Sequence, residues 1–307
     1  MTGLRWGICA QVKADQVAVE TFVAHHLELG ADRVAVYFDD PEDGAIAASL
    51  ARFSPRIETH LCDTAHWQAL NGRRPGKKTV RQTANATDAY RRMPVDWMAH
   101  IDVDEFILPF ERAASVAALL AAVPPDEIIL RLRPYEALSN PDGTPPHQFR
   151  APPEPGPQRA AIVQRLYGAQ AVGLIDGVIA HSVGKCFFRT GVAGLTPKIH
   201  FGQRNGARVD RAGFSADMAL LHYHAVDRDA WLAHVAYRAE HGAYSGRPAR
   251  QAFYQTATEA ELRAFHDAVQ TAGPALLDRL AAEHLLLTAE PGLEASRDRL
   301  FGPLTSR

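Results

Sequence analysis

An alternation of strand-like and helix-like segments over the first sixty residues limits the fold of this chain more than any other feature of its sequence. Short apolar runs rich in β-branched and aromatic residues alternate with segments whose apolar positions recur at helical spacing. The predicted strands are residues 6–12, 33–38 and 57–62, and the predicted helices are residues 17–29 and 46–53. Strands joined by helices form a parallel sheet with right-handed crossovers. We therefore expect an α/β fold that binds ligands beyond the carboxyl ends of its strands.

A cluster of acidic residues follows a fourth apolar segment, residues 97–101, which comes after a predicted helix at residues 79–92. Burying an unpaired carboxylate costs several kcal/mol, so the acidic residues should emerge where the strand ends. On an extended backbone Asp102 and Asp104 point to the same side and can share one hard cation with the phosphates of a ligand. An Asp-x-Asp pair also occurs in solvated turns and at helix N-termini. Here the apolar residues 106–108 follow, which favours a metal site over a solvated turn.

The remaining sequence predicts a mixture of strands and helices that ends in a helical region. Further strands are expected at residues 127–132, 185–189, 198–201 and 219–222, and further helices at residues 113–122, 228–238, 259–271 and 275–287. Proline and glycine are dense over residues 140–157, which predicts a long mobile loop. We therefore expect a catalytic domain over residues 1–226 and a helical appendage over residues 227–307 that packs on its sheet.

Composition argues against several classes of protein. The chain has 307 residues, 47% of them hydrophobic, which is enough for a large buried core. Its apolar runs stop well short of the roughly 20 residues that a bilayer requires, and no signal peptide is apparent. We therefore expect no transmembrane segment and a cytoplasmic location. The formal charge of −2 argues against a general nucleic-acid partner. Cys9, Cys62 and Cys186 show the spacing of neither a disulfide framework nor a zinc site.

Several motifs together resemble the family-2-like glycosyltransferases. They are residues 25–33 with the strand and the turn at residues 39–44 that follow, the pair Arg81 and Gln82, and the block at residues 96–106 that contains Asp-Val-Asp-Glu-Phe. The resemblance covers residues 6–235 and is most specific in that block. It implies the GT-A nucleotide-diphospho-sugar transferase fold, a mostly parallel Rossmann-like sheet with a C-terminal helical appendage. The turn departs from the family, which has Asn and Ser where this chain has Asp40 and Glu42.

The resemblance implies a metal-dependent glycosyltransferase that moves a sugar from a nucleotide-diphosphate donor, most typically a UDP-sugar, to a carbohydrate or other hydroxyl acceptor. Asp102 and Asp104 would hold Mn²⁺ or Mg²⁺ against the donor diphosphate. A divalent cation stabilises the negative charge that develops on the leaving diphosphate as the glycosidic bond breaks. A downstream histidine often supplies a third protein ligand in this family. His222 matches its place, with His200 and His224 as alternatives.

Other residues are candidates for contacts with the donor or for proton transfer. The groups expected to contact the donor nucleotide are Lys13, Asp39, Arg81, Asp102, Lys185 and His200. Asp39 ends the second predicted strand and can accept hydrogen bonds from a nucleobase or ribose, or it forms a local Asx-turn. An inverting mechanism requires a carboxylate at the acceptor hydroxyl. Glu105 and Glu136 are the candidate catalytic residues, with Asp176 as an alternative. A retaining mechanism stays open.

Two other classes of function are compatible with paired aspartates on such a sheet. A nucleotidyltransferase or phosphoester-cleaving enzyme also uses two aspartates and a divalent ion. Such an enzyme should carry a further carboxylate cluster or a glycine-rich phosphate loop after the first strand, and residues 10–15 offer neither. A non-catalytic sugar-binding module that keeps the fold is the other alternative, and the altered turn with Asp40 and Glu42 keeps it open.

Overall fold

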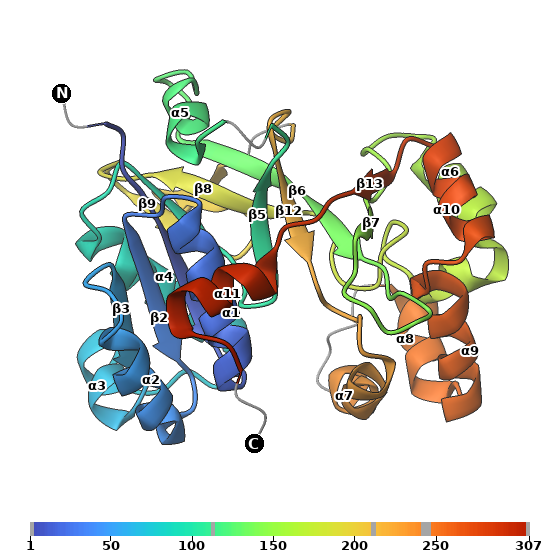
Figure 1. Cartoon of the computed structure of the whole chain (residues 1–307), viewed down its shortest axis with the longest axis horizontal. Helices are drawn as coiled ribbons and strands as arrows, with labels where there is room; N and C mark the ends of the chain where they lie inside the picture. The colour runs from blue at the N-terminus through green and yellow to red at the C-terminus, as the bar shows by residue number, and fades with distance from the viewer. Residues whose placement is uncertain (1–2, 112–113, 210–212, 241–246, 305–307) are drawn as a thin grey trace. The chain divides into compact units, whose positions relative to one another are not determined.

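The chain divides into two compact units, and each is assembled from segments that are separate in sequence. The computed structural model describes residues 3–111, 114–209, 213–240 and 247–304 (Figure 1). The first unit comprises Met1–Arg133, Gly184–Leu220 and Pro291–Arg307, and the second comprises Pro134–Val183 and Leu221–Glu290. Residue 226, the expected domain boundary, lies within a segment of the second unit.

Four parallel strands form the centre of the first unit. They are β1 (Trp6–Val12), β2 (Arg33–Phe38), β3 (Ile57–Leu61) and β4 (Trp97–His100), in the order β4-β1-β2-β3. Val12 lies opposite Phe38, and Cys9 lies opposite both Ala35 and His100. The residues of β1 and β4 are all buried, because both faces carry side chains that pack under helices. The strands and the parallel pairing expected for this region are confirmed.

Helices surround these parallel strands. They are α1 (Gln16–Glu28), the 3-10 turn η1 (Pro41–Asp43), α2 (Gly44–Ala51), α3 (Thr64–Asn71) and α4 (Lys78–Arg92). Asp15 begins α1 by accepting a hydrogen bond of 2.8 Å from the Ala18 amide. The chain leaves α1 through Gly30, whose φ of 93° favours glycine. Ala86 and Ala89 are buried where α4 packs on β1. The helices expected here are confirmed, and α3 is additional.

Beyond β4 the first unit continues with antiparallel pairs. β8 (Lys185–Arg189) pairs with β4 on one side and with residues 129–132 of β6 (Ile129–Ala137) on the other. β5 (Glu105–Pro109) pairs with β12 (Met218–His222), whose first three residues belong to this unit. A small antiparallel sheet contains β9 (Leu195–Pro197), β10 (Gly202–Arg204) and β11 (Ala207–Val209). The strand expected at residues 198–201 is wrong, since these residues connect β9 to β10.

Two further helices complete the first unit. α5 (Val116–Ala121) is shorter than the helix expected at residues 113–122, and Ala113 lies outside the described residues. α11 (Leu293–Phe301) returns to pack on α1, and the two lie side by side in Figure 1, red beside blue. There Arg297 donates a hydrogen bond of 2.8 Å to Glu20, and both side chains are buried. The chain therefore ends its described course on the same helix that follows its first strand.

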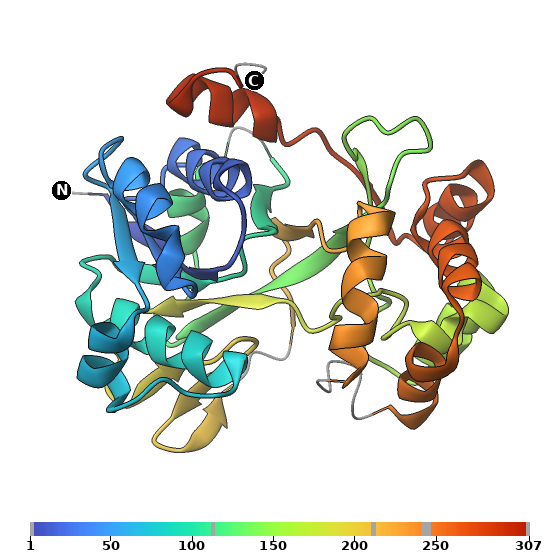
Figure 2. The same cartoon turned by 90° about the horizontal axis from the view of Figure 1, so that it is seen from below.

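The second unit is mostly helical around a short antiparallel sheet. Its helices are α6 (Arg159–Tyr167), the 3-10 segment η2 (Gly168–Gly173), α7 (Arg228–Glu240), α8 (Pro248–Thr256), α9 (Glu259–Gln270) and α10 (Pro274–Ala282); α7 to α10 are orange to red in Figure 2. Trp231, Phe265 and Leu280 belong to its buried hydrophobic core. The sheet contains β7 (Gln148–Arg150) and β13 (Leu286–Thr288), and Glu136 at the end of β6 lies opposite Arg150. The helices expected near α7, α9 and α10 are confirmed.

Two expectations for the second unit are corrected. The loop expected over residues 140–157 contains β7, in which Phe149 and Arg150 are fully buried. The helix expected over residues 275–287 ends at Ala282, and the leucines that follow continue into β13. Both strands are only three residues long, so neither carries enough alternation to be recognised in the sequence.

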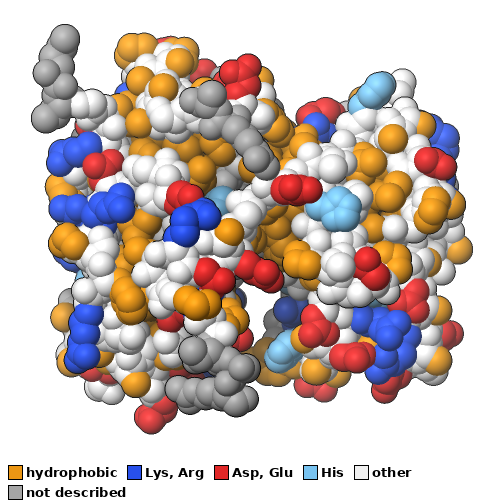
Figure 3. Space-filling view, viewed as in Figure 1, with side chains coloured by type: hydrophobic (Ala, Val, Ile, Leu, Met, Phe, Trp, Pro, Cys, Tyr) orange, Lys and Arg blue, Asp and Glu red, His pale blue; other side chains and the backbone are white. Residues whose placement is uncertain are grey.

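One face of the molecule carries charges of both signs. On the face drawn in Figure 3, Lys and Arg side chains are interspersed with Asp and Glu side chains. Within the described ranges, no helix combines the length and the apolar character needed to cross a membrane.

Candidate functional site

The carboxyl ends of the parallel strands place acidic and amide side chains at one edge of the first unit. Asp39 follows β2 directly, Asp102 comes two residues after β4 ends, and Gln11 is the second-last residue of β1. Since β4, β1 and β2 are neighbouring parallel strands, their carboxyl ends meet at the same edge. In α/β sheets this edge is where ligands bind.

Residues 102–105 form a closed turn, here called the acidic turn. The Glu105 amide donates a hydrogen bond of 3.1 Å to the Asp102 carbonyl, and the Asp102 amide donates one of 2.7 Å to Glu105 Oε2. Glu105 is fully buried, whereas Asp102 and Asp104 are half-buried. These two reciprocal bonds fix the backbone of the turn, so the position of the Asp104 backbone is defined within the first unit.

The Asp102 carboxylate is held from two sides. Gln82 Nε2, on α4, donates a hydrogen bond of 2.7 Å to Asp102 Oδ1, and the buried Lys185 ammonium donates to Asp102 Oδ2. Lys185 Nζ also lies 3.3 Å from Glu105 Oε2. Lys185 begins β8 just after Gly184, where an added Cβ would lie 1.9 Å from the Leu132 carbonyl oxygen. The close approach of β8 to β6 at this glycine therefore brings the Lys185 side chain into contact with Asp102 and Glu105 of the acidic turn.

The pKa values in this group follow from burial and from the ammonium. Burial acts to raise the pKa of Asp102, but the attraction of Lys185 outweighs it and holds that pKa well below its usual range. Burial acts to lower the pKa of Lys185, but Asp102 and Glu105 raise it. Burial and the nearby Lys185 ammonium lower the pKa of His100 to about 4. At neutral pH, Asp102 and Lys185 are therefore charged and His100 is neutral.

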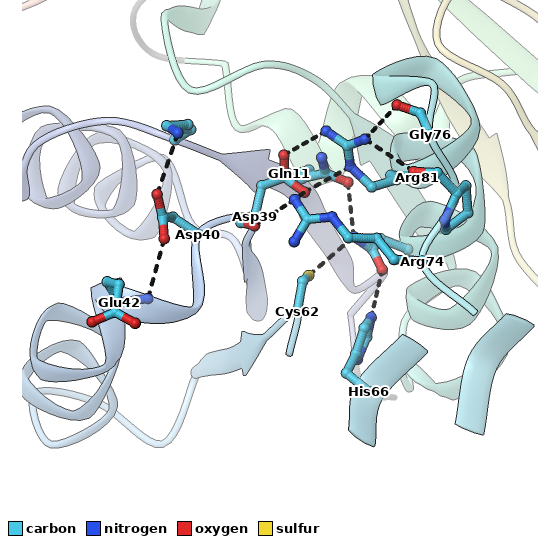
Figure 4. A network of polar contacts seen from close by, with 12 residues as sticks. Gln11, Asp39, Asp40, Glu42, Cys62, His66, Arg74, Gly76 and Arg81 are labelled. Carbon is cyan, nitrogen blue, oxygen red and sulfur yellow. Dashed lines mark hydrogen bonds and ion pairs between the residues drawn. The ribbon is translucent and has the colours of Figure 1, made fainter. Parts of the chain in front are cut away.

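A second ion-pair group, here called the arginine clamp, consists of Asp39, Arg74 and Arg81 (Figure 4). Arg81 is bidentate, with hydrogen bonds of 2.8 Å from Nε and from Nη2 to the two carboxylate oxygens of Asp39. Arg74 Nη2 donates one of 3.0 Å to Asp39 Oδ1. Asp39 is buried, and the Arg74 side chain is 42% exposed. Two guanidinium groups on one carboxylate give the clamp a net positive charge beside the strand ends.

A chain of amide groups lies next to the arginine clamp (Figure 4). His66 Nε2 is 2.9 Å from Asn85 Oδ1, and Asn85 Nδ2 donates hydrogen bonds to Gln11 Oε1 at 2.8 Å and to Cys62 Sγ at 3.4 Å. Burial raises the pKa of the Cys62 thiol to about 12, so the thiol stays protonated. The sequence interpretation did not single out this chain. The feature of the sequence that could have indicated it is the spacing of Gln82 and Asn85. These amide side chains lie three residues apart on the buried face of α4, and Asn85 is the one that joins this chain.

The other residues expected to contact a donor in the first unit have local partners. Lys13 Nζ lies 3.2 Å from Asp40 Oδ2, and the Lys13 side chain is 73% exposed. His200 Nδ1 is 2.8 Å from the Gly184 carbonyl oxygen, so this ring lies against the start of β8. The strand ends, the acidic turn and the arginine clamp therefore bring together Asp39, Arg81, Asp102 and Lys185, while Lys13 lies on the exposed side of η1.

Glu136 and Asp176, the other carboxylates considered for proton transfer, belong to the second unit. Glu136 is buried, accepts hydrogen bonds of 2.9 Å and 3.2 Å from the Ile179 and Ala180 amides, and pairs with Arg150 at 3.0 Å. Burial acts to raise the pKa of Glu136, but Arg150 and neighbouring histidines lower it overall. Asp176 pairs with two arginines and accepts a hydrogen bond of 2.6 Å from a serine hydroxyl. Glu136 therefore pairs with a buried guanidinium, whereas Asp176 pairs with one half-buried and one exposed guanidinium.

His222 lies in a group of histidines in the second unit. It is the buried last residue of β12, and its ring centroid is 4.9 Å from that of His181 and 5.2 Å from that of His224. The potential ligand nitrogens of His222 lie within 4.8 Å of those of both neighbours. The structure thus brings two of the expected histidines together and adds His181, for which the sequence carries no motif. His200 belongs to the first unit.

Comparisons with known proteins place the chain only broadly. No protein-family model and no curated protein matches it. Among solved structures, it is similar to HddC from Yersinia pseudotuberculosis, with a TM-score of 0.27 and 11% identity over 44% of this chain and 58% of that one. It is also similar to the apo structure of the bifunctional glycosyltransferase WbbM, with a TM-score of 0.29 and 10% identity over 62% of this chain and 32% of that one. The chain thus spans less than two thirds of either protein, and these values define no family.

Proposed function

We propose that this protein is a glycosyltransferase of the family-2-like, GT-A type, which moves a sugar from a nucleotide-diphosphate donor to a hydroxyl acceptor. The observation that carries the proposal is the pair of acidic groups, Asp39 and the acidic turn, at the carboxyl ends of β2 and β4, the two parallel strands that flank β1. Such an edge is the general ligand-binding position of α/β sheets. The sequence of the acidic turn, Asp-x-Asp-Glu-Phe, supports the same function.

Cationic groups beside the acidic turn suit a diphosphate. Lys78, at the start of α4, is close enough to Asp102 to lower its pKa, and the Arg74 side chain, 42% exposed, contacts Asp39 at the end of β2. Negative charge develops on the diphosphate as the bond to the sugar breaks, and fixed positive groups stabilise it there. Asp39 is the group proposed for the nucleoside, and Arg74 and Lys78 are proposed to lie along the phosphates.

The residues of the acidic turn fit a hard divalent cation. Carboxylate oxygens are the ligands that Mg²⁺ and Mn²⁺ prefer, and Asp104 and Asp102 present theirs from a fixed backbone. When bound, such an ion would neutralise charge on the donor diphosphate. A third protein ligand is proposed from the sequence resemblance alone, which names His222, with His200 and His224 as alternatives. We propose Mn²⁺ or Mg²⁺ as the cofactor and a UDP-sugar as the first donor to test.

The proposed bases would have to act from buried ion pairs. Glu105 pairs with Lys185, and Glu136 pairs with Arg150. If either carboxylate accepted a proton, it would lose its charge and its ion pair with that buried cation. Glu105 and Glu136 are therefore both proposed as the base, and experiment must decide between them.

Thermal melting with nucleotides tests the proposal. The full chain is melted with UDP, GDP, dTDP or ADP, each with and without Mn²⁺, and Asp104→Asn is the matched variant. Binding to the folded state alone adds about 2.7 kcal/mol of stability at a ligand concentration 100 times Kd. We expect one nucleotide to raise the melting temperature in the presence of Mn²⁺, and the shift to be lost in Asp104→Asn. A protein that responds to none of the four nucleotides, and releases no nucleotide from the corresponding sugar donors, would refute the proposal.

A further inference from the structure

The Lys185 ammonium lies at the base of the acidic turn, between two carboxylates. It donates to Asp102 Oδ2 and lies 3.3 Å from Glu105 Oε2, while only 1% of the residue is exposed. Glu105 is fully buried beside it. A lysine is almost never buried to this extent without paired carboxylates, so its position reflects the charge of the turn.

The Lys185 ammonium occupies the position that a metal ion would take between the two carboxylates. Asp102 Oδ2 and Glu105 Oε2 belong to two different carboxylates, and both contact the single Lys185 ammonium. Glu105 Oε2 is also the acceptor that closes the turn to the Asp102 amide. A cation that contacts two carboxylates at once is the arrangement that a divalent ion adopts among oxygen ligands. Here the chain itself supplies that cation.

We propose that Lys185 is the resident cation of the acidic turn, a positioning residue that holds Asp102 and Glu105 together before any divalent ion binds. The purpose of this arrangement rests on the proposed function, because a turn formed in advance binds a metal and a diphosphate without being reordered. The claim about Lys185 itself concerns only the charge of the turn. It extends the sequence expectation, in which Lys185 contacted the phosphate.

Removal of the ammonium should make a divalent ion take its place. In Lys185→Met, a side chain of similar length without charge, the carboxylates of Asp102 and Glu105 lose the ammonium that they share. The free variant is therefore less stable than the wild type. Added Mn²⁺ or Ca²⁺ can then bind both carboxylates and restore the turn, and binding to the folded state alone raises stability.

The experiment compares the melting temperatures of the full-length wild type and of Lys185→Met, with and without millimolar Mn²⁺ or Ca²⁺ and with no nucleotide. We expect the variant to melt several degrees lower than the wild type in EDTA and to gain a larger upward shift from either ion. Lys185→Arg, which keeps the positive charge, should respond as the wild type does. The double variant Lys185→Met with Glu105→Gln should lose the additional shift, because one of the two carboxylates is gone.

Two results would overturn the proposal. One is an equal shift with divalent ions in the wild type and in Lys185→Met. The other is a Lys185→Met chain that stays unfolded in millimolar Mn²⁺, since the ion should restore the missing charge. Because no nucleotide is present, the result is independent of the nucleotide test. Rescue of the variant by metal, with no nucleotide binding by the wild type, would refute the proposed function alone.

Discussion

Replacing Glu136 by Gln should destabilise the second unit, because this carboxylate is the partner of a buried guanidinium. Glu136 and Arg150 have side chains that are 2% and 0% exposed and lie 3.0 Å apart. Removing one charge of a buried pair costs about 3–5 kcal/mol. Glu136→Gln keeps an oxygen for the Ile179 and Ala180 amides, so we expect a loss near 3 kcal/mol on the same scale. Glu136→Ala also leaves two amides without that acceptor and should lose more.

Urea unfolding followed by circular dichroism measures this loss, and its pH dependence gives an independent check. The pKa of Glu136 is lower in the folded chain than in the unfolded chain. Its contribution is therefore fully present above the unfolded pKa of about 4.3 and is lost as the pH falls through the folded value. The difference between wild type and Glu136→Gln should be largest at pH 7 and should shrink below about pH 4.

The double variant Glu136→Leu with Arg150→Met is the control, since it removes both charges. It should be more stable than Glu136→Leu alone, because no buried charge is left without a partner. A Glu136→Gln protein within about 0.5 kcal/mol of the wild type at pH 7, the range of neutral surface changes, would refute the structural role. If that protein had also lost sugar transfer, Glu136 would be assigned to proton transfer instead.

Four further outcomes are expected. His222→Ala should weaken Mn²⁺-dependent nucleotide binding measured by calorimetry, and an unchanged affinity would remove His222 from the proposed site. Arg81→Ala should lower the free energy of unfolding by about 2 kcal/mol in urea titration, because it removes charged hydrogen bonds from a buried carboxylate. Arg74→Ala should cost less, since Arg74 is the more exposed member of the arginine clamp. In hydrogen exchange without ligand, residues 148–150 of β7 should be protected while the exposed residues 141–145 exchange fast, and equal protection of both would contradict the strand assignment.

The parallel strands could be predicted from the sequence because each is a continuous apolar run. β1 and β2 have the expected bounds, since their side chains are buried on both faces and turn residues follow them. β7 and β13 could not be predicted, because three residues show no period. Leu286 and Leu287 continue the apolar pattern of α10, so the sequence predicts a longer helix where the structure has β13.

The structure brings several of the residues proposed from the sequence close to one another, but the sequence does not predict their contacts. Asp39, Asp102 and Lys185 were all selected from their types and their places next to strands. Their partners depend on register between distant segments. Lys185 meets Asp102 because β8 pairs antiparallel with β4, with Cys186 opposite His100. No pattern within either strand specifies that pairing, so the sequence indicated a phosphate contact where the structure has an internal ion pair.

The return of α11 to α1 has a consequence for the order in which the protein can be completed during synthesis. Glu20, buried near the beginning of the chain, takes its hydrogen bond from Arg297, 277 positions later. The ribosome must therefore translate the whole second unit before the first unit receives its last helix. Contacts of such high sequence separation are formed slowly, and domains otherwise tend to fold from the N-terminus as they emerge. On the ribosome, the parallel sheet with α1 should therefore exist as an intermediate with Glu20 still open to water, and it should lock only when residue 297 arrives.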